Sequence, residues 1–226
     1  MKKKFAAITT SLLLFCTVSL AQAALTTIGT ASYLGSDYKL IWDNDNNGNS
    51  IVWLDYSRHA YWYNQNYWEG QNYWAAGLDS FLTYNIDAAY TVTWDDTGWR
   101  LPSAGTDPQC SYNQITSEMG HLFYTELGNQ GWQASDDNWG LNNTGDFDNL
   151  IASDYWSGTE NAGYPDSAWY FDMYNGFQCT NSTDHELYGL AVCSAQVSEV
   201  PIPAAIWLLG SGLIGLVGLR RKKFRE

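Results

Sequence analysis

Residues 38–56 have the sequence YKLIWDNDNNGNSIVWLDY. Segments 38–43 and 51–56 are short runs of apolar, aromatic and β-branched residues, which predicts two strands. The turn between them is polar and rich in Asn and Gly, so the two strands are expected to form a hairpin. An antiparallel sheet is therefore predicted near the start of the folded domain.

The turn of this hairpin also resembles a calcium loop. Asp43, Asp45 and Asn47 match the first three side-chain ligand positions of an EF-hand, and Gly48 matches the glycine that follows them. Leu54 occupies the place of the closing bidentate acid, and the flanking segments are strands rather than helices. A weak calcium site at Asp43, Asp45 and Asn47 stays open, but a solvated turn is favoured.

The rest of the chain predicts helices in the middle and strands at the end. Residues 67–82 and 116–129 carry apolar side chains at helical spacing, with Thr116 or Ser117 capping the second helix and Gly128 ending it. Residues 133–151 are long, polar and loop-like. Strands are then predicted at residues 154–158, 168–173 and 188–192. This order indicates an α+β domain with an antiparallel sheet.

The N-terminus has the features of a secretory signal peptide. MKKK is a positively charged start, an apolar run follows, and Ala21-Gln22-Ala23 is a small-residue cleavage site, which predicts a signal peptide over residues 1–23. Cys16 follows Phe15 rather than a small residue, which disfavours a lipoprotein signal. Residues 24–198 are the predicted exported domain.

The exported domain is strongly acidic. Between Ala24 and Glu199 lie only three of the 11 basic residues but 23 of the 24 acidic ones, which leaves a net charge of −20. Such a domain repels nucleic acid and anionic membrane surfaces. It could attract divalent cations or a basic partner, although an acidic surface without a specific ligand is the simpler interpretation.

Aromatic residues are the most suggestive feature of the exported domain. It holds 11 of the 12 Trp residues, and exposed Trp and Tyr are common where sugars or proteins are bound. Trp139 and Trp156, in or near the long polar loop, are the candidate ligand-contacting residues, while a core role is the simpler expectation for any single aromatic.

Three cysteines fall in the exported domain, where an oxidising compartment permits disulfides. Cys179 and Cys193 are close in sequence and are the favoured pair. Cys110 is then either free or bonded to another chain.

The C-terminal segment, residues 199–226, has the sequence EVPIPAAIWLLGSGLIGLVGLRRKKFRE. Its apolar stretch of 18 residues from Ile202 to Leu219 spans roughly 27 Å as a helix, slightly less than a bilayer core of about 30 Å. Val200, Pro201 and Pro203 keep the start extended, and a basic cluster that includes Arg220 and Arg221 ends the helix.

This segment resembles a PEP-CTERM sorting signal. The resemblance implies a short transmembrane helix that holds the chain during sorting, recognition by an exosortase and removal of the tail. It also implies a Gram-negative producer of extracellular polysaccharide and a cell-surface or matrix location for the mature protein. A permanent membrane anchor is the alternative.

A second resemblance lies within the domain. GWRLPS (98–103), DYWSGTE (154–160) with AWYFDMYNG (168–176), and LAV (190–192) resemble, in order and spacing, the C-terminal domain of the Legionella collagen-like protein. That family is similar to C-type lectin-like folds, so the resemblance implies two helices, antiparallel strands and a long loop region.

Individual residues of these motifs can be interpreted further. Arg100, in the GWRLPS motif, is one of only three cations in a domain of net charge −20, so it is expected to form an internal ion pair that fixes the loop, with ligand binding as the alternative. Cys193 stands where the family usually has an Arg after LAV, which supports the Cys179–Cys193 pairing. The Glu-Pro-Asn motif of calcium-dependent sugar binding is absent, so a mannose-type calcium site is not expected.

No motif for catalysis stands out, and no cofactor is expected. The chain has no G-x-S-x-G sequence, and so many acids are present that no single carboxylate pair can be selected. The favoured hypothesis is a non-catalytic surface or matrix protein that binds glycan, exopolysaccharide or protein. The alternatives are a structural matrix component without a specific ligand and an enzyme that acts on polysaccharide.

Overall fold

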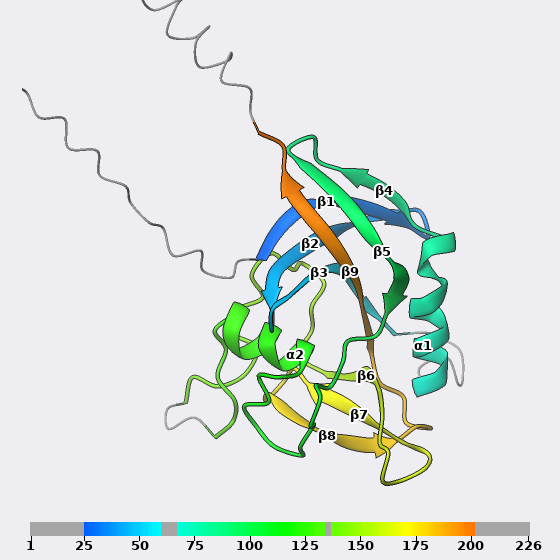
Figure 1. Ribbon diagram of the computed structural model, residues 1–226. Coiled ribbons are helices and arrows are strands. Elements are labelled where there is room, and N and C mark those ends of the chain that lie inside the picture. The colour runs from blue at the N-terminus through cyan, green and yellow to red at the C-terminus, as the bar shows by residue number, and fades with distance from the viewer. Residues whose placement is uncertain (1–24, 60–66, 134–136, 202–226) are drawn as a thin grey trace, which may run out of the picture.

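The computed structural model describes residues 25–59, 67–133 and 137–201. Within these residues the chain forms nine strands in two antiparallel sheets, with two short helices (Figure 1). The larger sheet contains six strands in the order β4-β1-β2-β3-β9-β5. Their bounds are β1 (Leu25–Tyr33), β2 (Ser36–Asn46), β3 (Asn49–Arg58), β4 (Thr83–Ile86), β5 (Tyr90–Arg100) and β9 (Gly189–Glu199).

The predicted hairpin over residues 38–56 is confirmed as β2 and β3. Ile41 lies opposite Trp53, and Asp43 lies opposite Ile51. Side chains of these strands alternate between the two faces of the sheet, and both faces are covered. Leu40 belongs to one hydrophobic core and Ile41 to another, and both are completely buried. The hairpin therefore lies between the two cores and contributes side chains to both.

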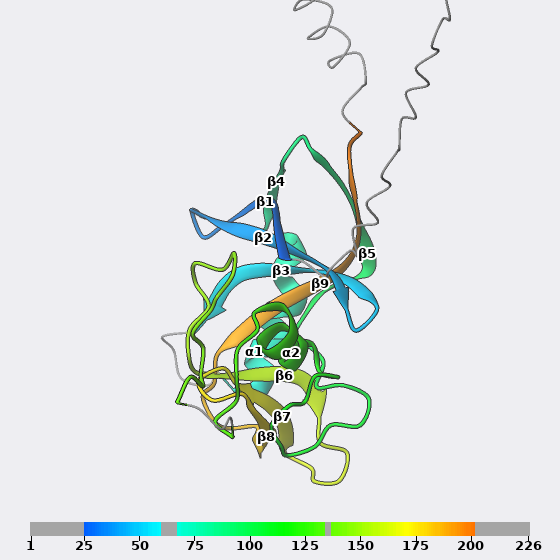
Figure 2. The same ribbon diagram turned by 90° about the vertical axis from the view of Figure 1, so that its left-hand side faces the viewer.

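The larger sheet curls until its two edges meet (Figure 2). Its edge strands β4 and β5 lie at opposite ends of the strand order, yet only a short turn connects them, in which the Tyr90 amide donates to the Asp87 carbonyl at 2.9 Å. Tyr84 of β4 stacks on Trp94 of β5 with ring centroids 4.8 Å apart. Trp99 Nε1 donates to the Tyr84 hydroxyl at 2.8 Å. These aromatic contacts close the curl.

Helix α1 (Trp68–Gly77) covers one side of the curled sheet, and a 3₁₀ turn (Leu78–Ser80) continues it. The helix predicted over residues 67–82 is thus confirmed. Ala75 and Leu78 are buried in the first core. Phe81, one of the apolar residues at helical spacing in the predicted helix 67–82, is 69% exposed because the chain leaves helical geometry at that residue.

The second predicted helix, over residues 116–129, is confirmed but short. Helix α2 (Glu118–His121) continues into a π-helical turn (Leu122–Glu126). Ser117 caps its start by accepting a hydrogen bond from the Gly120 amide at 3.0 Å, and Gly128, with φ of 63°, ends it. The predicted apolar stripe is buried against β3 and β9 in the second core: Met119, Leu122, Phe123 and Leu127.

The smaller sheet lies on the other side of α2 from the curled sheet (Figure 1). It consists of β6 (Asp154–Glu160), β7 (Ser167–Asp172) and β8 (Phe177–Ser182). Tyr155 and Phe171 pack into the second core. On the opposite face of these strands, Asp154 lies directly across from Asp172. Burial, with the neighbouring Asp172, raises the pKa of Asp154 to about 6.

The expected α+β fold of the C-type lectin-like kind, with two helices, is wrong. The described chain is mostly β, and a curled antiparallel sheet replaces the expected arrangement. Strands were predicted where apolar residues cluster, and those at 154–158, 168–173 and 188–192 are confirmed. Strands β1, β4, β5 and β8 were missed because they are rich in Thr, Asp and Asn, and their pairing with neighbouring strands overrides their weak hydrophobic patterns.

No helix within the described ranges is long and apolar enough to cross a membrane. The predicted signal peptide over residues 1–23 and the predicted transmembrane helix from Ile202 to Leu219 lie outside the described residues. Both stay predictions.

The Asp154–Asp172 pair predicts a specific dependence of stability on pH. The pKa of Asp154 is higher in the folded chain than its ordinary value, so ionisation of this carboxyl disfavours the fold, and stability is lost as the pH rises from about 4 through about 6. Asp154→Asn should raise the free energy of unfolding at pH 7.5 by about 1–2 kcal/mol, with allowance for partial solvation.

Urea unfolding of both chains at pH 4 and pH 7.5 measures this effect. Most of the gain should be lost at pH 4, where Asp154 is protonated in the folded state and about half protonated in the unfolded state. Asp96→Asn removes the same charge from an exposed position of β5 and serves as the control. An equal gain in stability from both variants would show that net charge, and not the burial of Asp154, causes the gain.

Candidate functional site

The loop after β5 is held by the ion pair between Arg100 and Glu118. Arg100 donates from Nη1 and Nη2 to the two carboxylate oxygens of Glu118, each at 2.7 Å. The Ser103 amide donates to the same carboxylate at 2.7 Å. Arg100 therefore has the loop-fixing position expected for it, since both ends of its guanidinium are bonded to Glu118.

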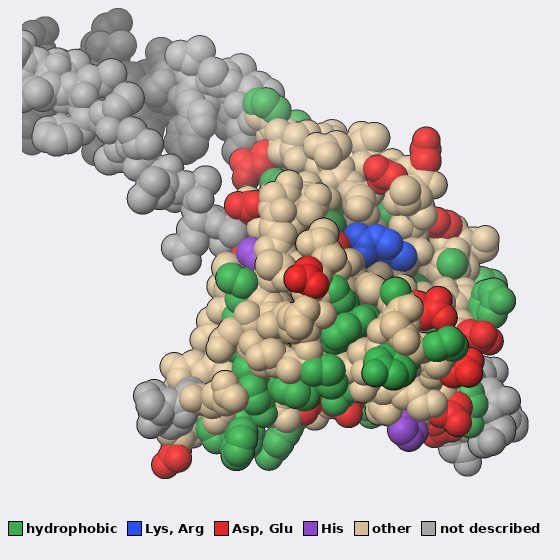
Figure 3. Space-filling view, turned by 60° about the horizontal axis from the view of Figure 1, so that its bottom comes forward, with side chains coloured by type: hydrophobic (Ala, Val, Ile, Leu, Met, Phe, Trp, Pro, Cys, Tyr) green, Lys and Arg blue, Asp and Glu red, His purple; other side chains and the backbone are tan. Residues whose placement is uncertain are grey.

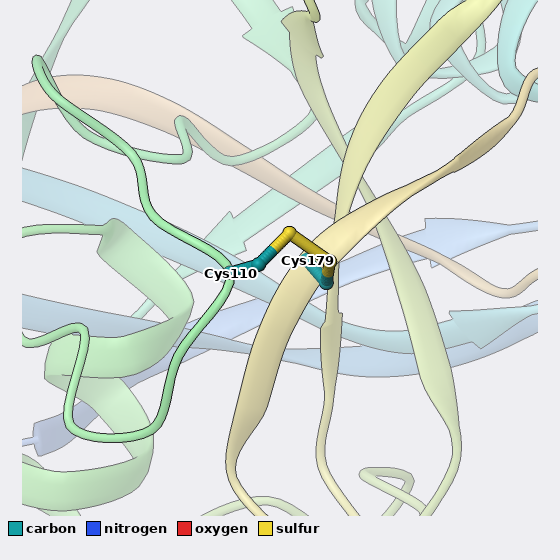
Figure 4. The surroundings of a disulfide bond; sticks show 2 residues. All are labelled: Cys110 and Cys179. Carbon is teal, nitrogen blue, oxygen red and sulfur yellow. A yellow bond between two sulfur atoms is a disulfide. The ribbon is translucent and has the colours of Figure 1, made fainter.

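A disulfide fixes the same loop farther along. Cys110 is bonded to Cys179 of β8, so the loop that carries Cys110 is tied to the smaller sheet (Figure 4). The expected Cys179–Cys193 pairing is wrong. Cys193 is a buried free thiol in β9, which belongs to the larger sheet, and burial raises its pKa to about 12. Nearness in sequence was misleading because the chain changes sheets between the two cysteines.

Between this loop and the π-helical turn lies a hollow of about 330 Å³. Its lining consists of phenol, amide and glycine groups: Tyr112, Asn113, Tyr124, Asn129, Gln130, Gly131 and Gln133. We call this set the groove. The Tyr124 hydroxyl donates to the Gly176 carbonyl at 2.7 Å, which fixes the phenol. A Cβ atom on Gly131 would lie 2.5 Å from that hydroxyl, so glycine keeps the space open.

Exposed aromatic side chains flank the groove. Trp132 is 59% exposed and lies beside Tyr112, with ring centroids 6.4 Å apart. Tyr174 is 55% exposed and meets Trp139 edge-on at 5.4 Å. The Trp132 amide donates to the Asn175 carbonyl at 2.9 Å, which holds the two aromatic pairs close together. Figure 3, which looks toward the β8 side, shows hydrophobic side chains gathered along the lower part of this face.

Asn129 organises the segment that carries Trp139. Its Oδ1 accepts hydrogen bonds from the amides of Asn142 at 3.0 Å and Asn143 at 2.9 Å. Its Nδ2 donates to the Asn143 carbonyl at 2.8 Å. The residue is 6% exposed, so these bonds are largely shielded from water. One side chain thus joins the groove wall to the loop that holds Trp139 against Tyr174.

The two tryptophans predicted as ligand contacts have different environments in the structure. Trp139 lies beside the groove, half-buried against Tyr174. Trp156 is completely buried in the first core and cannot touch a ligand. The sequence reasoning missed Trp132 and Tyr112. The run NQGWQ, residues 129–133, carried the signal, because a Trp among Gly, Asn and Gln in a loop lacks apolar neighbours to bury it.

The predicted calcium ligands have separate environments. The Asp43 carboxylate is buried and accepts hydrogen bonds from Asn46 Nδ2 at 2.8 Å and Trp53 Nε1 at 3.3 Å. Asp45 instead accepts from the Gly48 amide at 2.9 Å in the exposed turn, and Asn47 donates to Asn46. Among the described residues, no group of three or more His, Cys, Asp or Glu side chains is arranged to hold a metal ion.

A buried ionisable cluster lies beneath this turn. His121 Nε2 lies 3.1 Å from Glu126 Oε1, and their side chains are 12% and 1% exposed. Burial raises the pKa of Glu126, and the neighbouring Asp43 raises it further. Because these groups are enclosed, we regard them as part of the contact between α2 and β2 rather than as a substrate site.

The predicted sorting residues lie at or beyond the end of the described chain. The Val200 amide donates to the Ala89 carbonyl at 2.7 Å, and Pro201 is exposed. Pro203, Arg220 and Arg221 lie outside the described residues.

Asn129→Ala should loosen the segment around Trp139 while leaving both cores folded. Loss of three shielded hydrogen bonds should lower the free energy of unfolding by about 1–3 kcal/mol. Hydrogen–deuterium exchange should speed up at the amides of Asn142 and Asn143. Asn85→Ala, at an exposed position of β4, is the matched control. Unchanged exchange at these two amides would show that Asn129 does not organise the segment.

Comparisons of the chain with protein-family models, with curated proteins and with solved structures gave no match. The resemblances to the PEP-CTERM signal and to the Legionella collagen-like protein domain therefore stay predictions. The groove and its flanking aromatics are the basis on which a function can be proposed.

Proposed function

We propose that this chain is an exported, non-catalytic surface or matrix protein that binds carbohydrate through the groove. One observation carries the proposal: exposed aromatic rings, Trp132 and Tyr174, flank a hollow lined by amides and phenols. Exposed apolar patches rimmed by polar residues commonly mark ligand-binding grooves and interaction sites.

The chemistry of the groove matches that of a sugar ring. A pyranose presents a face of C–H groups, which packs on an aromatic ring, and an edge of hydroxyls, which both donate and accept hydrogen bonds. Asn113, Gln130 and Gln133 also donate and accept, because each carries an amide. The groove and its flanking aromatics therefore offer rings for the C–H face of a sugar and amides for its hydroxyls on one surface.

Catalysis is a weaker alternative. Hydrolysis of a glycosidic bond ordinarily requires two carboxylates at the scissile bond. The lining of the groove, as described, contains no Asp or Glu. A polysaccharide held there would be bound without being cut.

A protein partner is also a weaker alternative. An apolar protein surface laid over the groove would bury its amides without partners, which costs free energy for each unsatisfied group. The hydroxyls of a glycan can bond to those amides and to water at the same time. The polar lining thus favours a glycan.

Export and sorting belong to the same proposal. The signal peptide at residues 1–23 and the tail at residues 199–226 support export, with an exosortase as the sorting partner and the surface or matrix of a Gram-negative bacterium as the destination. The Cys110–Cys179 disulfide supports it independently, because such bonds persist mainly in oxidising compartments.

Trp132→Ala and Tyr174→Ala should each weaken binding of the purified domain to polysaccharide by roughly tenfold, since buried aromatic contacts dominate such interfaces. Affinity electrophoresis in gels that contain a neutral glucan or mannan measures this. Tyr73→Ala is the control, because Tyr73 is 78% exposed on α1, away from the groove. A calcium chelator should change nothing.

Two outcomes would contradict carbohydrate binding at the groove. In one, no polysaccharide in a broad panel retards the wild-type domain. In the other, Tyr73→Ala weakens binding as much as the groove variants do.

Sorting makes a separate prediction about the mature protein in its native host. Mass spectrometry of its C-terminal peptide should find an end close to Pro203, with Arg220 and Arg221 removed. An intact tail on the mature surface protein would instead support a permanent membrane anchor.

A further inference from the structure

The charge around the groove limits which polysaccharides it can accept. All seven lining residues are uncharged at neutral pH in their ordinary ionisation states. Within the described ranges the chain has only Lys39, Arg58 and Arg100 as basic residues. A carboxylated or sulfated glycan in the groove would need a cation within reach.

Each of the three cations is engaged away from the groove. Lys39 Nζ lies 2.8 Å from Asp148 Oδ2. Arg100 is bonded to Glu118, and Arg58 donates to Gln71 Oε1 at 2.7 Å while its guanidinium lies over the Trp74 ring. On the face drawn in Figure 3, Lys and Arg side chains are visible at one place only, which is separate from the hydrophobic lower part of that face.

Negative charge, by contrast, lies next to the flanking aromatics Tyr174 and Trp139. Asp172 accepts a hydrogen bond from the Tyr174 amide at 2.7 Å, at the base of the turn that carries one flanking aromatic. Asp137 is exposed two residues before Trp139. An anion bound at the flanking aromatics would be repelled by these two carboxylates. Salt would screen that repulsion only partly, because the Debye length is about 8–10 Å at 0.1–0.15 M ionic strength.

The aromatic pairs indicate how the ligand lies. Trp132 with Tyr112 and Tyr174 with Trp139 are two stacking positions, joined through the Trp132–Asn175 backbone hydrogen bond. A single sugar ring covers one position only. A chain of several units can cover both and also bond to the amides of the groove.

Building on carbohydrate binding as the proposed function, we infer that the ligand is an uncharged polysaccharide, held along an internal segment of several sugar units. The groove rejects acidic polysaccharides for lack of a cation, and it holds single sugars poorly because one stacking position stays empty.

The test uses polysaccharides that differ in charge alone. Polygalacturonate and alginate are compared with the same polymers after reduction of their carboxyl groups, next to a β-glucan and a galactomannan. In 20 mM salt, at least one neutral or reduced polymer should bind tenfold more tightly than every native acidic one. The gap should narrow in 500 mM salt, and affinity should rise from monosaccharide to hexasaccharide of the bound type.

Gln130→Lys adds a cation to the groove and should increase binding of the native acidic polymers at least threefold in 20 mM salt. Gln196→Lys makes the same change at an exposed position of β9 in the larger sheet. It should not increase binding of the acidic polymers. Equal increases from both variants would show that net charge alone excludes anions, and would overturn the assignment to the groove.

The remaining outcomes separate this inference from the proposed function. If native acidic polymers bind as tightly as their reduced forms and Trp132→Ala abolishes that binding, the inference is wrong and carbohydrate binding at the groove stands. If no polymer binds, both are wrong. If the monosaccharide binds as tightly as the hexasaccharide, the internal-segment geometry is overturned.

Discussion

Glu118 accepts three hydrogen bonds from the end of β5 and the segment that follows it, and the candidate site depends on them. Arg100 supplies two of the donors and the Ser103 amide the third. The carboxylate is largely buried at the first residue of α2, so removal of Arg100 would leave an unpaired charge inside the protein, which is costly. The ion pair therefore fixes where α2 begins relative to the curled sheet. The loop between Arg100 and Glu118 contains Cys110 and one wall of the groove, so that wall is positioned by the same contact.

The groove is lined by one stretch of chain, residues 112–133, in which a loop, a helical turn and the segment after it come together. Tyr112 comes from the loop tied by the disulfide to β8, Tyr124 from the π-helical turn, and Gly131 from the segment that also carries the flanking Trp132. Tyr174 comes from the turn between β7 and β8. The disulfide and backbone hydrogen bonds hold these segments, while the Trp132 and Tyr174 side chains stay more than half exposed. The Tyr124 hydroxyl, by contrast, is bonded to a backbone carbonyl and serves to shape the floor. This division between supporting and exposed groups is what a preorganised binding surface requires.

Much of the sheet could be predicted, whereas the fold class could not. The β2–β3 hairpin and strands β6, β7 and β9 contain dense apolar runs, because several of their side chains are buried in one core or the other. Strand β1, with the sequence LTTIGTASY, and strand β5 carry mostly polar side chains and give no such signal. Without β1, β4 and β5 a sheet of this size cannot be recognised, and the two short helices then receive too much weight. The α+β expectation failed for this reason. The C-type lectin-like expectation rested on a resemblance, and motifs such as GWRLPS specify a turn and a buried Trp99 rather than the topology around them.

The sequence by itself determined the acidic composition, the hairpin, the places of both helices and an abundance of aromatics that suggested some at the surface. It also indicated the ion-pair role of Arg100 and selected Trp139. Only the tertiary structure decided that Trp156 is buried while Trp132 is exposed, because burial depends on which elements pack over a residue. Likewise it decided that Cys179 is bonded to Cys110, 69 residues away in sequence, rather than to Cys193. Strands β8 and β9 belong to different sheets, and distance in space, not in sequence, decides which side chains can meet.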